Sequence, residues 1–158
     1  MNWYRITADF HKLTFAHKCR LNSLSEEWQR ELAALWRLEA DVNNGAYLQF
    51  LENWGRESYA DTSQALKKIG AARMAEIVDQ CQALVDELVD GERRPGRLKR
   101  LLANPVIDLV TGNLIQRRSV LPRKVRERIY ELSYEFMDYP DDISALGTKY
   151  YSRSLEIA

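Results

Sequence analysis

The chain has 158 residues, of which 46% are hydrophobic and 29% charged, and its formal net charge is zero. This length suits a single domain with a buried core, and this composition excludes a disordered chain. No uncharged apolar run approaches the roughly 20 residues that a membrane span needs, so no membrane association is expected. The first residues show no basic stretch followed by an apolar one, so we expect no secretory signal and a cytoplasmic location.

Residues 1–24 are predicted to form an N-terminal arm or short helix, because their apolar residues follow neither a helical nor a strand period. A long helix is predicted from Ser25, a capping residue, to Asn43 or Asn44, and Gly45 is expected to supply the positive φ that ends it. The apolar residues of this helix recur at helical spacing: Trp28, Leu32, Leu35, Trp36 and Val42.

Two shorter helices and one long helix are predicted next. The first follows Gly45 and ends at Gly55, and the second is capped by Asp61 and ends at Gly70. The clearest helical period in the chain runs from Met74 to Leu88 and predicts a helix packed against the preceding bend.

The last third of the chain divides into an ambiguous segment and two helices. Residues 97–121 are open to two interpretations, because 106–116 fits either a short β-hairpin or two helical turns separated by Gly112. One helix is predicted from Pro122 to before Pro140, and a final one begins at Asp141 or Asp142. The predicted fold is all-α, a compact single-domain bundle of about six helices over 25–158.

The bend after the first long helix carries an unusual number of amides and carboxylates among aromatic residues. Such groups must be paired within the fold or presented to a ligand. We favour the structural interpretation, and the alternative is a small-molecule hydrolase or ligand site. The residues of this corner are Glu39, Asn43, Asn44, Gln49 and Asn53.

Charge is segmented along the chain. Residues 1–91 hold ten basic against fourteen acidic residues, 92–128 hold eleven against three, and 129–158 hold two against six. An acidic face can imitate a row of phosphates, and a basic block can bind them. For both sets the alternative is an ordinary solvated surface. The candidate acidic face is Glu26, Glu27, Glu31, Glu57, Asp61, Glu76, Asp79, Asp86 and Glu87, and the candidate basic patch is Arg93, Arg94, Arg97, Lys99, Arg100, Arg117, Arg118, Arg123 and Lys124.

Motifs of catalysis and metal binding are not evident. His11, His17 and Cys19 do not supply the three or four converging ligands that a metal needs. Cys19 and Cys81 fit no redox or zinc spacing, so we expect reduced thiols, with a single disulfide as the alternative. No Gly-rich phosphate loop or nucleophile motif occurs, so we expect no catalytic residue, no metal and no cofactor.

The segment from Leu35 to Asn53, LWRLEADVNNGAYLQFLEN, resembles the signature of a bacterial family whose best-known member is a DNA-mimic protein. The resemblance covers residues 28–88 and, less closely, 123–150, and Ala46 stands where the family usually has a second glycine. It implies an all-α fold without catalysis. It also implies an acidic surface that occupies the DNA-binding site of another protein.

From these observations we predict a non-enzymatic protein-binding or inhibitory module with a basic partner, a DNA-binding regulator by resemblance. Three alternatives remain at this stage: an immunity protein that neutralises a toxin or nuclease, a nucleic-acid binder that uses the 93–128 block, and a hydrolase at the corner. The oligomeric state is not predicted.

Overall fold

The computed structural model describes residues 3–92 and 121–157. Every regular element in these two ranges is helical, which confirms the all-α prediction. The hairpin considered for 106–116 lies outside the described residues. The elements are α1 (Trp3–Leu13), the 3-10 turns η1 (Phe15–His17) and η2 (Leu21–Ser23), α2 (Glu27–Ile69), α3 (Ala72–Glu92), α5 (Arg123–Met137) and α6 (Ile143–Ile157).

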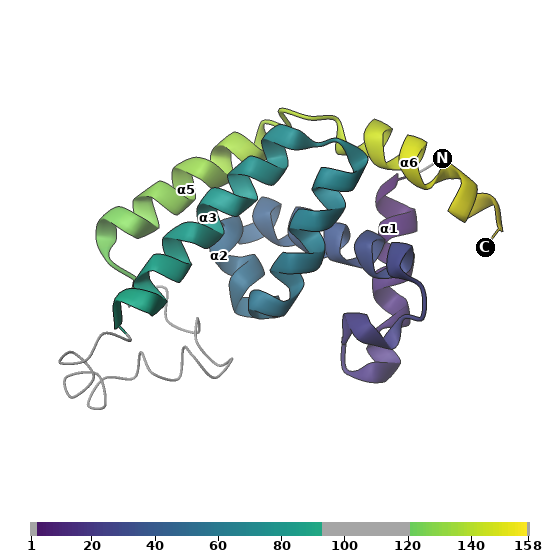
Figure 1. The fold of residues 1–158 in the computed structure, drawn as a ribbon, viewed down its shortest axis with the longest axis horizontal. Helices are drawn as coiled ribbons and strands as arrows, with labels where there is room; N and C mark the ends of the chain where they lie inside the picture. Colours follow the sequence, from purple (N-terminus) through teal and green to yellow (C-terminus); the bar gives the residue numbers. More distant parts are fainter. Residues whose placement is uncertain (1–2, 93–120, 158) are drawn as a thin grey trace.

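The kinked helix α2 forms the centre of the molecule, and the other helices pack around it. α3 and α5 lie side by side at one end, whereas α1 and α6 meet at the other (Figure 1). The core gathers the apolar faces of these helices, and Tyr47, Phe50 and Phe136 are among its fully buried side chains. None of the described helices is both long enough and apolar enough to cross a membrane.

Helix α2 consists of three helical segments joined by two sharp bends. Non-helical backbone angles occur at Gly45 and Ala46, and again at Gly55. These are the breaks that the glycines predicted, but two local predictions were wrong. The N-cap is Glu26 rather than Ser25, and no side chain caps this end. Asp61 does not begin the third segment, because the chain is helical again directly after Gly55.

In the first bend the positive φ occurs at Ala46 and not at Gly45, where it was expected. Gly45 has φ −159° and ψ 26°, whereas Ala46 has φ 65° and ψ 178°. The freed Tyr47 amide donates to the buried Ser133 Oγ at 3.0 Å. The bend is therefore anchored on α5, and it holds an alanine in a region of backbone space that suits glycine.

We expect Ala46→Gly to raise the free energy of unfolding by about 1 kcal/mol. The backbone strain that it relieves, about 1–3 kcal/mol, exceeds the extra entropy of glycine in the unfolded chain. Gly55→Ala is the matched opposite, because Gly55 has φ 64° and ψ −166° with open space around the missing Cβ. That variant should lose about 2 kcal/mol. Urea unfolding measures both, and a destabilised Ala46→Gly would contradict the assignment of strain to this bend.

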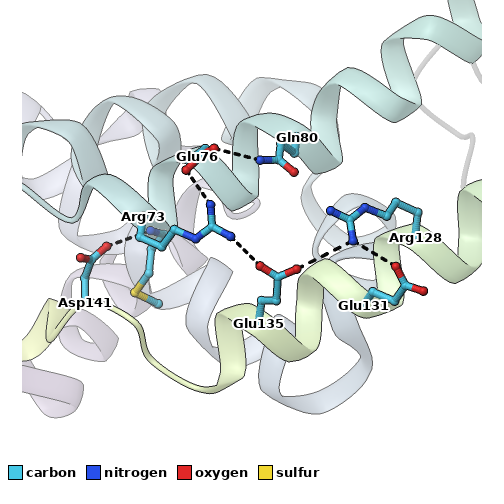
Figure 2. A network of polar contacts seen from close by, with 8 residues as sticks. Arg73, Glu76, Gln80, Arg128, Glu131, Glu135 and Asp141 are labelled. Atoms are coloured by element: carbon cyan, nitrogen blue, oxygen red, sulfur yellow. Dashed lines mark hydrogen bonds and ion pairs between the residues drawn. The ribbon is translucent and has the colours of Figure 1, made fainter.

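The two ends of the molecule are fastened by contacts between distant segments. Asp141 accepts a hydrogen bond from the Met74 backbone amide at 2.8 Å and so caps α3 from the α5–α6 turn (Figure 2). Asp142 accepts from the Ala145 amide at 2.9 Å and caps α6 itself. At Gly147 a Cβ would lie 2.2 Å from the Trp3 ring, so α6 can approach α1 because this residue has no side chain.

Candidate functional site

The first bend of α2 contains a buried carboxylate that sequence reasoning did not single out. Asp41 is 8% exposed and accepts three side-chain hydrogen bonds. The donors are Gln49 Nε2 at 3.2 Å, Asn53 Nδ2 at 3.0 Å and Trp54 Nε1 at 2.6 Å. These bonds run from the first segment of α2 to the second, so Asp41 ties the two sides of the bend together.

A second polar cluster lies on another side of the same helix. Tyr139 Oη donates to Glu39 Oε1 at 2.8 Å, and Asn43 Nδ2 donates to Tyr139 Oη at 2.9 Å. Asn43 Nδ2 also bonds the Glu39 backbone carbonyl at 2.8 Å. Burial raises the pKa of Glu39, and burial together with the Glu39 charge raises the pKa of Tyr139 to about 12.

The five residues expected to form one corner therefore divide between two places. Glu39 and Asn43 are four residues apart and share a helix face, whereas Asp41 lies between them and points to a different side. Gln49 and Asn53 bond to Asp41, and Asn44 is exposed at the bend. The corner is mostly bonded within the fold, and its polar groups do not converge on one cavity.

Beside the Asp41 cluster lies a buried arginine that the sequence analysis also missed. Arg37 is 2% exposed, and its guanidinium lies 4.0 Å from the centre of the Trp54 ring. Its Nε donates to His11 Nδ1 at 3.2 Å, and one Nη donates to the Cys19 carbonyl at 2.6 Å. The available signal was its position four residues before Asp41, which places both side chains on one face.

His11 has to be neutral to accept that bond. Burial, and secondly the Arg37 charge, lowers the pKa of His11 to about 4. Its ring stacks on Trp36 with centroids 4.2 Å apart. Burial also lowers the pKa of Arg37 to about 10, well above neutral pH, so the guanidinium keeps its charge.

The Arg37 region opens to a cleft of about 640 Å³. The cleft lies between the loop that joins η1 to η2 and the second bend of α2. It has a mixed polar and aromatic lining, formed by Lys18, Cys19, Arg20, Leu21, Asn22, Arg37, Asn53, Trp54, Ser58 and Asp61. Asn53 is thus the one predicted corner residue that lines this cleft.

The predicted acidic residues near the start of α2 differ in their surroundings. Glu26 is exposed, and Glu27 pairs with Lys68 at 2.7 Å. Glu31 is 4% exposed, pairs with the same lysine and accepts a hydrogen bond from Tyr151 Oη at 2.8 Å. Glu31 therefore stabilises the packing of α6 against α2 and is not available to a partner.

The acidic residues of the third segment and of α3 differ in their partners. Asp79 pairs with Lys67 at 2.7 Å, and burial raises the pKa of Asp61. Asp86 accepts from Gln82 Nε2 at 2.8 Å, and Glu87 is exposed. The side chain of Glu57 lies outside the described residues.

Opposite charges also alternate across the surface that α3 and α5 share. Arg73 bridges Glu76 on its own helix and Glu135 on α5, at 2.7 Å to each. Arg128 contacts Glu131 at 3.0 Å and Glu135 at 3.8 Å (Figure 2). Glu76 is thus part of an exposed ion-pair network, a type of contact that contributes little to stability but balances local charge.

Two residues of the predicted basic patch, Arg123 and Lys124, lie among the described residues. Arg123 and Lys124 are exposed at the start of α5, where Arg123 pairs with Glu127 at 2.7 Å. Outside the described residues lie Arg93, Arg94, Arg97, Lys99, Arg100, Arg117 and Arg118.

Both cysteines are free thiols, so the disulfide alternative is wrong.

Comparison with known proteins gives one match. A family model described as DMP19-like protein matches residues 22–156. No curated protein and no solved structure matches the chain.

Proposed function

The chain belongs to the DMP19-like protein family, a family of DNA mimics, and on this basis we propose that it is a non-enzymatic protein that binds another protein. In its specific form, exposed carboxylates of α2 and α3 occupy the basic DNA-binding surface of a regulator and so inhibit it. Family membership over most of the chain is the observation that carries this proposal.

The geometry of the first bend supports this assignment. Four of the five corner residues are bonded to Asp41 or to Tyr139. Polar groups with internal partners maintain a bend and have little capacity left for a substrate. Recognition then falls to charged groups on the outer surface of the helices.

Three of the predicted acidic residues are buried or already paired, so they are excluded from the proposed contact surface. Glu31 is buried, and the carboxylates of Glu76 and Asp79 already neutralise Arg73 and Lys67. Glu26 and Glu87 are exposed, at the start of α2 and near the end of α3. Long-range attraction between such carboxylates and a basic surface speeds association and weakens as salt screens it.

Affinity capture from a bacterial extract at low salt tests the proposal. Immobilised wild-type protein should retain a basic DNA-binding protein, and moderate salt should elute it. Glu26→Lys with Glu87→Lys should reduce capture about tenfold or more, because each reversal replaces attraction by repulsion.

Asp138→Lys is the control, because Asp138 is exposed on the turn after α5 and lies outside the proposed surface. This variant should capture the same protein as the wild type. Undiminished capture by the double variant would refute the proposed surface, and recovery of no basic protein would refute the function. Recovery of a toxin or nuclease would replace the regulator by the immunity alternative.

A further inference from the structure

The cleft beside Arg37 is lined by more cationic than anionic side chains. The described side chains that line it include Lys18, Arg20 and Arg37 but only one carboxylate, Asp61. The chain as a whole has no net charge. The lining of this cleft therefore has a local excess of positive charge. A cleft with walls of low dielectric strengthens the electric field of such charges.

The innermost cation of the cleft lacks a contacting counter-charge. Arg37 donates to the neutral acceptors His11 Nδ1, Ser58 Oγ, Thr14 Oγ1 and the Cys19 carbonyl. Among the residues that the structure describes, no carboxylate forms an ion pair with it. Asp61 and Asp41 favour its charged form through space without contacting it. Burying a charge costs free energy unless an opposite charge compensates it, and a directly paired anion would do so most strongly.

The hydrogen bonds of Arg37 also leave capacity for a ligand. A guanidinium has five N–H groups, and one Nη1 hydrogen remains after the bonds to the four neutral acceptors. Arginine suits phosphate and carboxylate groups because its N–H groups form a planar fork.

The loop at the rim of the cleft has a strained backbone. Lys18 and Cys19 have φ 57° and 58°, a left-handed conformation that costs free energy in residues with a side chain. The loop is held there by the bond from Arg37 to the Cys19 carbonyl and by the Cys19 amide, which donates to the Thr14 carbonyl at 2.9 Å. The conformation places Lys18 and Arg20 at the same opening.

From these observations we propose that the cleft binds a small organic anion through a phosphate or carboxylate group. Arg37 supplies the charge at the base, and Lys18 and Arg20 supply it at the rim. A volume of about 640 Å³ is in the range of small-molecule sites. Trp54 and Asn53 also line the cleft, beside the space that the rest of the molecule would occupy. This site is separate from the protein-binding surface and does not depend on it.

Titration with inorganic phosphate and with citrate, each at constant ionic strength against chloride, tests the site. The indole N–H signal of Trp54 in NMR spectra is the readout, because Trp54 lines the cleft and the other three tryptophans do not. Its shift should saturate with at least one of the two anions. Phosphate alone would assign a phosphate ligand, and citrate alone a carboxylate. Saturation with neither would overturn the proposal.

Two sets of variants give opposite expected effects without removing Arg37, whose loss could unfold the protein. Lys18→Asn with Arg20→Gln should raise the dissociation constant about tenfold, and asparagine tolerates the left-handed backbone at position 18. Asp61→Asn should lower it about threefold, because a repelling charge is removed. Unchanged affinity in both sets would overturn the proposal.

Lys124→Gln with Lys149→Gln is the matched control, since both lysines are exposed and lie outside the cleft. It should bind the anion as the wild type does. The rim variant keeps Glu26 and Glu87, so it should still capture the protein partner. Failure of the anion site and failure of the proposed function are therefore distinguishable.

Discussion

Replacing Asp41 with alanine is expected to lower the free energy of unfolding by about 3 kcal/mol. The change leaves the donors of Gln49, Asn53 and Trp54 without their common acceptor. Each unsatisfied buried donor costs about 1–3 kcal/mol, and water reaches the partly exposed ones and reduces the total. Chemical denaturation followed by circular dichroism measures the loss.

Asp41→Asn separates the role of the carboxylate from that of side-chain volume. Asparagine keeps one accepting oxygen and turns an amide toward the remaining donors, so we expect a loss of about 2 kcal/mol. Asp9→Ala, on the exposed surface of α1, should change stability by less than about 0.5 kcal/mol. If Asp41→Ala were as stable as Asp9→Ala, Asp41 would not tie the bend together.

Acidification is expected to weaken the fold through His11. The pKa of His11 is about 4 in the folded protein, against an ordinary value of 6.5. The unfolded chain therefore binds a proton at a higher pH than the folded chain, and stability falls as the pH drops below about 6.5. Between about pH 7.5 and pH 4.5 this group alone should remove about 2.5 kcal/mol, most of what a shift of this size can contribute.

Burial of the ring is the main cause of this low pKa, and the charge of Arg37, whose Nε donates to His11 Nδ1, is the second. A protonated Nδ1 cannot accept that bond and would place a second positive charge beside the guanidinium. Glu39 has the opposite sign, because burial raises its pKa and its protonation on acidification favours the folded state. The measurement must therefore compare two proteins rather than two pH values alone.

His11→Gln provides that comparison, because glutamine keeps an accepting oxygen and does not titrate. The variant should be less stable than the wild type near neutral pH, since it loses the stacking on Trp36. Over the same pH interval, however, the variant should lose about 2.5 kcal/mol less of its free energy of unfolding than the wild type does. Equal pH dependence in the two proteins would exclude His11 as the group responsible.

Local signals in the sequence were sufficient for the helices that follow residue 25 and for the ends that glycine marks. Hydrophobic period and glycine position act within a few residues, so they identified the breaks at Gly45, Gly55 and Gly70. They did not identify which residue of the first bend has positive φ. That choice is made at Ala46, where the next amide bonds to Ser133 on α5.

In the candidate sites, too, local sequence signals identified some residues and missed those whose partners are distant in the chain. The sequence identified a polar corner with Gln49 and Asn53 but not its acceptor, because any of several carboxylates could have filled that role. Arg37 was missed because most of its partners, from His11 to Cys19, come from an N-terminal segment with no clear period.

By itself, therefore, the sequence determined an all-α chain, the positions of its bends and its membership of the DMP19-like protein family. Only the tertiary structure decided which charges face solvent. Glu26 and Glu31 have the same side chain, yet one is exposed and the other is bonded to Tyr151 in the interior. The physical reason is that exposure depends on which distant helix packs over a residue. The residue and its neighbours in the sequence do not specify that helix.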